Sequence, residues 1–211
     1  MITKLESEFM LAGNRWFRDD GNNTLRLNYD LNCDSIVFDI GGYKGDFAEE
    51  MVRLYDCHVY LFEPSVEFFR IAQARFSANK KVKCFNYGLS DSNCKMMLSN
   101  EGNKSSVMDV KSHQTGSQVD IQNFKDVFDR EGIEDIDLIK INIEGGEYPL
   151  MRHIIKEGLA PRIKNFQIQF HIKDFIPNVS SMREDIQHAL SETHNLDWCY
   201  TFIWENWSLK D

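Results

Sequence analysis

The feature that most constrains the fold of this sequence is the alternation of short apolar runs with segments of helical spacing. Continuous apolar runs of this length are typical of parallel strands that are buried on both faces. They predict strands at 35–40, 58–63, 81–87, 136–143 and 165–171. The intervening segments predict helices at 46–56, 66–79, 122–131, 146–158 and 180–193. Strand–helix alternation of this kind indicates an α/β fold with a doubly wound, mostly parallel sheet and helices on both faces.

The two ends of the chain depart from this alternation. We expect an amphipathic helix at 2–18 and an exposed or edge strand at 24–31, so that residues 1–34 lead into the core. An aromatic-rich segment, 198–207, closes the sequence. A chain of 211 residues, of which 42% are hydrophobic, can bury one good core, and no change of composition marks a boundary. The sequence therefore predicts a single domain over 1–211.

The pattern weakens between the third and fourth predicted strands. Short strands are expected at 94–98 and 117–121, and the segment 99–118 is a loop rich in Gly, Asn and Ser. This loop follows the third strand, on the side of the sheet where ligands bind. It predicts either a lid that folds over an acceptor or a disordered surface insertion.

Composition excludes several classes of protein. The formal net charge of −9, with no basic cluster, argues against a nucleic-acid partner or an anionic membrane surface. The N-terminus lacks the apolar core of a signal peptide, and no apolar run approaches the roughly 18 residues of a membrane span. Five widely spaced cysteines without a C-x-x-C pair indicate reduced thiols in a cytoplasmic protein.

The stretch IVFDIGGYKGDF places a glycine-rich turn after the first buried strand, where parallel sheets bind ligands. The phosphate-loop pattern fails because the lysine of this turn precedes glycine rather than Ser or Thr. The dinucleotide pattern G-x-G-x-x-G fails because the glycines are Gly41, Gly42 and Gly45. Asp39 and Asp46 flank the turn with negative charge, which suits a cationic or neutral ligand. S-adenosylmethionine, with its positive sulfonium, is such a ligand.

A second acid supports this interpretation. Glu63 ends the second predicted strand in LFEPS, where a carboxylate can accept both hydroxyls of a ribose. Pro64 then directs the chain toward the next helix. The alternative is that the glycines only make a tight turn and that Glu63 is a surface acid. The combination of these features at strand ends favours the cofactor site.

The segments VFDIGGYKGDF, YLFEPS, NYGLSD and DLIKINIEGGEYPLM resemble the FkbM family of S-adenosylmethionine-dependent methyltransferases, over about residues 35 to 171. The resemblance implies a class I methyltransferase (Rossmann-like) fold, with a seven-stranded sheet whose last strand is antiparallel. It also implies methyl transfer to a hydroxyl oxygen, commonly of a sugar or a secondary metabolite. The cofactor contacts that it implies are Asp39, Gly41, Gly42, Gly45, Glu63, Gly88, Leu89 and Asp91.

Two departures from the family pattern concern metal binding. The family motif resembles K-I-D-V-E-G, whereas this sequence has Asn142 in place of the acid. The fifth strand commonly ends in Glu-x-His, whereas here it ends in Gln169-Phe170-His171. Both changes replace a carboxylate by an amide, and magnesium usually takes charged carboxylates. We therefore expect no metal.

Polar residues near the fourth strand are candidates for the acceptor site. Along a strand Lys140 would share a face with Asn142 and Glu144, and it either pairs with an acid there or orients the substrate. Glu144 precedes the next helix and is the expected pocket residue. Glu147 lies in the first turn of that helix, where ordinary dipole compensation explains an acid.

The end of the fifth strand supplies the expected general base. His171 ends a buried strand at the ligand-binding edge and matches the histidine of the family's ending. Its alternative role is a hydrogen bond to a loop carbonyl. Gln169 and Asn142 could hold neighbouring acceptor hydroxyls. Trp204 could form a sugar-stacking wall, although aromatic residues at alternate positions are more often core.

These features predict an S-adenosylmethionine-dependent O-methyltransferase with the catalytic set Lys140, Asn142, Glu144 and His171. The expected acceptor is a small polar molecule, namely a sugar of a surface glycan or its nucleotide-linked precursor. Nucleic acid and membrane insertion are not expected. The alternatives are an N-methyltransferase or another small-molecule methyltransferase on the same fold, and a catalytically idle cofactor-binding module.

Overall fold

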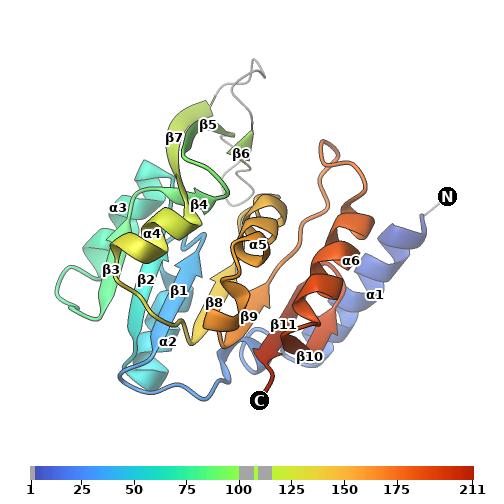
Figure 1. Ribbon diagram of the computed structural model, residues 1–211, viewed down its shortest axis with the longest axis horizontal. Coiled ribbons are helices and arrows are strands. Elements are labelled where there is room, and N and C mark those ends of the chain that lie inside the picture. Colours follow the sequence, from blue (N-terminus) through green and yellow to red (C-terminus); the bar gives the residue numbers. More distant parts are fainter. Residues whose placement is uncertain (1–2, 100–106, 109–115) are drawn as a thin grey trace.

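A computed structural model describes residues 3–99, 107–108 and 116–211 and shows one large sheet between two layers of helices (Figure 1). The strands of this sheet are β1 (Ile36–Ile40), β2 (His58–Phe62), β3 (Val82–Phe85), β8 (Leu138–Ile141), β9 (Asn165–Ile168), β10 (His194–Tyr200) and β11 (Trp204–Leu209). Their order is β10-β11-β9-β8-β1-β2-β3. The last strand, β11, runs antiparallel to β9 and β10, and the other neighbouring strands pair in parallel. The predicted seven-stranded, mostly parallel sheet is confirmed.

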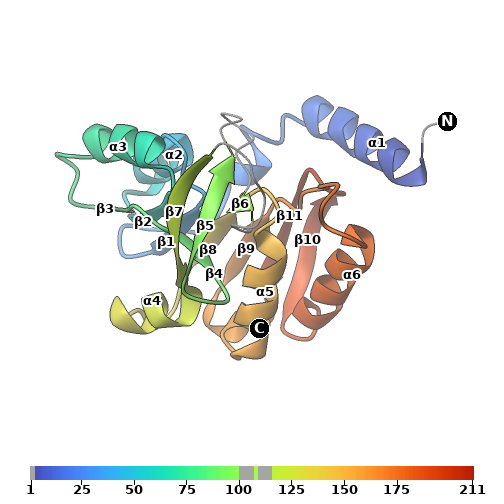
Figure 2. The ribbon, with the colours of Figure 1, turned by 90° about the horizontal axis from the view of Figure 1, so that it is seen from above.

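Six helices cover the two faces of the sheet, as Figure 2 shows. One face carries α1 (Lys4–Arg18), α2 (Asp46–Tyr55) and α3 (Val66–Arg75). The other carries α4 (Phe124–Arg130), α5 (Glu147–Lys156) and α6 (Val179–Leu190). Each face has its own core because side chains alternate along a strand. In β1, Val37 packs toward α2 and Phe38 toward α4, and both are fully buried.

The segment 24–31 is not a strand, contrary to the prediction. It contains a short 3-10 helix, η1 (Leu25–Leu27), followed by extended chain. Leu27 and Tyr29 do pack against the core on the α2 side, which explains the alternating pattern. The backbone of Tyr29, however, donates to the Tyr55 hydroxyl at 3.0 Å instead of to a neighbouring strand.

A smaller, second sheet lies between β3 and β8 in the chain. Its strands are β4 (Gly88–Ser90), β5 (Cys94–Ser99), β6 (Val107–Met108) and β7 (Gly116–Asn123), in the order β4-β7-β5-β6. The strands predicted at 94–98 and 117–121 are therefore confirmed. Most of the loop predicted at 99–118, namely 100–106 and 109–115, lies outside the described residues. The lid stays a prediction.

Polar side chains form a clasp at the base of the β5–β7 hairpin. The Asn93 side-chain oxygen accepts the Asn123 N–H at 2.8 Å, and the Asn93 amide donates to Asp126 at 2.8 Å. The Asn123 amide in turn donates to the Asp91 carbonyl at 2.7 Å. These bonds fix the point where the hairpin leaves the body of the molecule, above which it projects in Figure 1.

Within the part of the chain that the structure describes, no helix has the length and apolar character needed to cross a membrane.

Candidate active site

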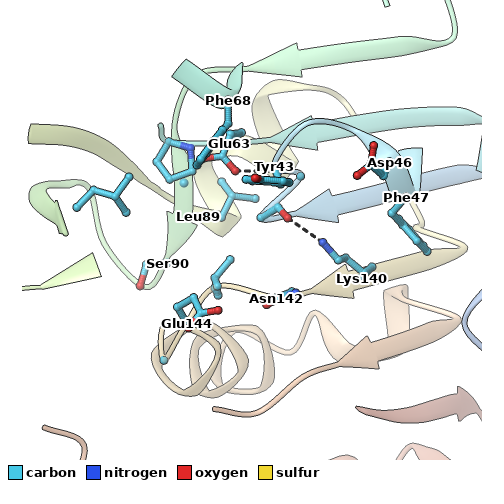
Figure 3. Close-up of a pocket in the computed structure, with 18 of the residues that line it drawn as sticks. Tyr43, Asp46, Phe47, Glu63, Phe68, Leu89, Ser90, Lys140, Asn142 and Glu144 are labelled. Carbon is cyan, nitrogen blue, oxygen red and sulfur yellow. Dashed lines mark hydrogen bonds between the residues drawn. The ribbon is translucent and has the colours of Figure 1, made fainter. Parts of the chain in front are cut away.

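A cavity of about 860 Å³ opens at the carboxyl ends of β1, β2 and β8, where ligands bind in sheets of this kind (Figure 3). Its wall includes Gly41 and Gly42 from the turn after β1, and Glu63 from the end of β2. Gly88 and Leu89 from β4 also line it, as predicted. The second sheet therefore contributes directly to the cavity.

The glycines of the turn are required by packing. Gly41 has a φ of +81°, and a Cβ there would lie 2.0 Å from the Asn142 carbonyl oxygen. The N–H groups of Gly41 and Gly42 both donate to the Phe62 carbonyl, at 3.0 and 3.1 Å. Gly45, at the start of α2, does not line the cavity and packs against Phe76. The turn is thus pressed between β2 and β8, with only backbone facing the cavity at Gly41.

Glu63 is buried, and its carboxylate oxygens each accept one hydrogen bond from the backbone. Its residue is 7% exposed, and its two carboxylate oxygens accept the N–H groups of Tyr43 and Ser65 at 2.9 and 2.8 Å. Burial raises the pKa of Glu63 to about 7, although these two hydrogen bonds oppose the rise. Each oxygen can accept a further bond, so the group can still receive ligand hydroxyls.

Lys140 and Asp39 form a buried ion pair across neighbouring strands. The Lys140 ammonium donates to Asp39 at 2.9 Å and to the Gly41 carbonyl at 2.8 Å. Burial lowers the pKa of Lys140, and the Asp39 carboxylate opposes this. Lys140 lines the cavity, whereas Asp39 is fully buried and does not. The partner of Lys140 is thus an acid on β1 rather than one on its own strand, and together they hold the glycine turn.

Asn142 and Glu144 follow β8 and line the cavity. Among the described residues, the side-chain amide of Asn142 has no hydrogen-bond partner, so it is available to a ligand. Glu144 has a φ of +55°, and its carboxylate lies 2.5 Å from the Lys173 ammonium and 3.3 Å from His171 Nε2. Burial acts to raise the pKa of Glu144, but these two cations hold it at about 2. Glu144 therefore stays ionised.

The surroundings of His171 oppose a role as general base. Its Nδ1 lies 3.1 Å from Glu147 and its Nε2 lies 3.3 Å from Glu144, so both ring nitrogens face carboxylates. Burial acts to lower the pKa of His171, but the two carboxylates raise it to about 9. The ring is protonated at neutral pH and does not line the cavity. In this arrangement His171 joins Glu144 to Glu147 instead of accepting a proton.

Protonated His171 is expected to make stability fall at alkaline pH. Because its pKa in the folded protein, about 9, exceeds the ordinary 6.5, its contribution is full below pH 6.5 and is lost as pH rises through 9. The loss should be roughly 3 kcal/mol in the free energy of unfolding, measured by urea denaturation between pH 6 and 10. His171→Gln should flatten this dependence, whereas His58→Gln, at an exposed position, should not. Equal pH profiles for wild type and His171→Gln would contradict this.

Besides Asp39, Gly45 and His171, three more predicted site residues lie outside the cavity wall. Asp91 is exposed, and its carboxylate accepts the hydroxyl of Ser92 at 3.1 Å. Gln169 is half-buried just beyond β9. Trp204 is buried in a cluster with Trp16, so the core alternative holds for it. None of the three touches the space where a ligand would lie.

The cavity also has walls that sequence patterns did not single out. Its further lining residues include Asn22, Arg26, Tyr43, Phe68, Phe175 and Ile176. The sequence signal that could have indicated Arg26 is its position as a charged residue inside the segment 24–31, which alternates apolar and polar residues. No group of three or more His, Cys, Asp or Glu side chains in the described ranges could hold a metal ion. The absence of a metal stays a prediction.

Known proteins resemble this chain in sequence and in fold. Residues 39–196 match the family model described as "Methyltransferase FkbM domain". Among solved structures, a "putative rRNA-methylase" from Clostridium thermocellum gives a TM-score of 0.57 at 7% identity, covering 92% of this chain and 95% of that one. An rRNA methylase from Streptococcus thermophilus gives 0.51 at 13% identity, covering 86% and 90%. No curated protein matches. At such low identities, the structural likeness shows a class I, Rossmann-like methyltransferase fold alone.

Proposed function

This chain belongs to the FkbM family of S-adenosylmethionine-dependent methyltransferases, and we propose that it methylates a hydroxyl oxygen of a small polar acceptor. The acceptor we favour is a sugar of a surface glycan or its nucleotide-linked precursor. The observation that carries this proposal is that one cavity contains both Glu63, at the end of β2, and the side-chain amide of Asn142, which has no hydrogen-bond partner among the described residues. A net charge of −9 favours such an acceptor over nucleic acid.

The residues present fit the cofactor. Glu63 would accept the ribose hydroxyls, and the backbone at Gly88 and Leu89 would lie beside the adenine. Gly41, whose missing Cβ lets the turn lie against Asn142, brings the backbone of the turn into the cavity wall. The cofactor supplies an activated methyl group on a positively charged sulfur.

The protein's own contribution to the reaction is to hold the acceptor oxygen in position for attack. Methyl transfer is an in-line displacement, so holding the acceptor oxygen in place provides much of the acceleration. The Asn142 amide and the Glu144 carboxylate would bind acceptor hydroxyls, because one donates and accepts while the other accepts. Protonated His171 and Lys173 keep Glu144 oriented.

Transfer of a labelled methyl group tests the proposal. The purified protein is incubated with labelled cofactor and separate panels of glycans, nucleotide sugars, amines and rRNA. Label on a sugar oxygen is the expected result, and it should persist in excess EDTA because no metal is expected. Label on nitrogen or rRNA would replace the proposed acceptor. Cofactor binding without any transfer would indicate the idle binding module.

Ionised Glu63 should make cofactor binding depend on pH. Its pKa of about 7 predicts that affinity for S-adenosylhomocysteine rises from pH 6 to pH 8, with proton release on binding near pH 6.5. Glu63→Gln should weaken binding roughly 10–100-fold, because an amide has a single oxygen that accepts, and it should remove the pH dependence, because an amide does not titrate in this range. Titration calorimetry in buffers of different ionisation enthalpy measures both effects. Glu67→Gln, at an exposed position on α3, is the control. Affinity that is independent of pH in the wild type would refute this role.

A further inference from the structure

Arg26 reaches the cavity, and it has no carboxylate partner in the part of the chain that the structure describes. Its Nε donates to the Gln167 side chain at 2.9 Å, and its Nη1 makes a long bond of 3.4 Å to the Asn22 side chain. Its Nη2 has no partner among the described residues, and in that same part of the chain no carboxylate forms an ion pair with Arg26. A guanidinium has five N–H donors, so most of them are available to a ligand.

The guanidinium is held in place from two sides. It lies 4.1 Å from the centre of the Trp204 ring, and Phe47 lies 5.6 Å away. Gln167 on β9 is fully buried, and its amide donates to the Arg26 carbonyl and to the Tyr29 hydroxyl at 3.0 and 2.7 Å. Such anchoring places the cation before any ligand arrives and limits the entropy lost on binding.

Nearby acids do not neutralise this end of the cavity. Asp39 is already bonded to Lys140. The Asp46 and Glu50 carboxylates, from α2, lie 2.6 Å from the guanidinium groups of Arg75 and Arg53. Burial lowers the pKa of Arg26 to about 10, so it remains cationic at neutral pH. An unpaired, partly buried guanidinium of this kind is a site for an anion.

We infer that Arg26 binds the carboxylate at the amino-acid end of S-adenosylmethionine. The inference rests on the proposed cofactor site. Arg26 is anchored to β9, whereas Glu63 ends β2, so the two groups lie on opposite sides of β8 and β1 in one cavity. A ligand with ribose hydroxyls at one end and a carboxylate at the other satisfies both. The planar fork of the guanidinium matches a carboxylate in two parallel hydrogen bonds.

This assignment changes the role of Trp204. The ring lies outside the cavity wall and packs against the guanidinium, so it is a positioning residue for cofactor binding. It also gives the segment before β1 a part in the site, although that segment precedes the family match, which begins at residue 39.

Binding of two related ligands tests the inference. S-adenosylhomocysteine carries the carboxylate, whereas methylthioadenosine shares the nucleoside and sulfur but lacks the amino-acid end. Arg26→Gln should weaken binding of the first roughly 10–100-fold and change binding of the second less than twofold. Arg70→Gln, which removes an exposed arginine on α3 outside the cavity wall, should leave the preference between the two ligands unchanged.

Each other outcome is decisive. If Arg26→Gln leaves S-adenosylhomocysteine binding unchanged but raises the KM for the acceptor, Arg26 binds an anionic group of the acceptor, and the inference is overturned. Equal weakening of both ligands would leave Arg26 a structural role only. If Arg26→Gln does not fold, the wild type should still prefer S-adenosylhomocysteine to its carboxamide by at least about tenfold, and equal affinities would overturn the inference. Failure of wild type to bind either ligand would instead refute the proposed function.

Discussion

Replacing Lys140 with methionine is expected to lower the free energy of unfolding by roughly 3–5 kcal/mol, the usual cost of breaking a buried ion pair from one side. The change leaves Asp39 fully buried without its cation. Asp39 Oδ2 is already the one buried side-chain nitrogen or oxygen atom of the described residues that lacks a hydrogen-bond partner. The Gly41 carbonyl loses its donor as well. Urea denaturation at pH 7 measures the change.

Two further variants separate the buried charge from lost packing. Asp39→Asn combined with Lys140→Met should recover part of the stability, because the uncompensated charge is then gone. Lys125→Met removes the cation of an exposed pair, Lys125–Asp129, of 2.6 Å, and should cost less than about 1 kcal/mol. Equal costs for Lys140→Met and Lys125→Met would show that the ion pair does not hold the turn.

Gly41→Ala is expected to be the most damaging small change in the cavity. The added Cβ would lie 2.0 Å from the Asn142 carbonyl oxygen and 2.9 Å from Ile143, at a φ of +81°. Strain at positive φ and overpacking together should cost roughly 2–5 kcal/mol in the free energy of unfolding. The turn must move away from β8 to relieve the contact, so affinity for S-adenosylhomocysteine should fall too.

Gly132→Ala is the matched control for this prediction. Gly132 has a φ of +65°, but a Cβ there would meet nothing within 4 Å. It should cost only the strain, about 1–2 kcal/mol, and leave ligand binding unchanged. If Gly41→Ala and Gly132→Ala lose the same stability in thermal unfolding and bind S-adenosylhomocysteine equally well in calorimetry, the close packing of Gly41 has no effect.

The core of the fold was predictable because its signal is local. Strands buried on both faces are apolar at most positions, as Val37 and Phe38 show by entering opposite cores, whereas Asp39 of β1 and Lys140 of β8 are charged and pair with each other. The segment 24–31 was not predictable in the same way. Its alternation correctly marks Leu27 and Tyr29 as facing the core. Whether the backbone also pairs depends on a neighbouring strand, which no local pattern records.

The candidate site also contains residues that local sequence signals predict and others whose roles depend on distant parts of the chain. The glycine turn and Glu63 could be found because each stands at a strand end. The partner of Lys140 could not, because Asp39 is 101 residues away in the chain. The prediction that Lys140, Asn142 and Glu144 share one face of a strand is wrong for Glu144. Strand β8 ends at Ile141, and the φ of +55° at Glu144 turns the chain out of the strand conformation. His171 likewise lies beyond the end of β9, where its neighbours are the acids of another loop and helix.

The clasp of Asn93 and Asn123 has a consequence for how the enzyme can diverge. It secures both ends of the β5–β7 hairpin independently of what lies between them. Leu98 and Ile121 of this hairpin line the cavity, whereas Gly41 and Glu63 belong to the main sheet. Mutations in the outer part of the hairpin, beyond the pairing of β7 with β4 at Gly88, would therefore reshape one rim of the cavity while the turn after β1 and the end of β2 stay as they are. The hairpin is a module through which relatives could acquire different acceptors, and it is the natural segment to exchange between them.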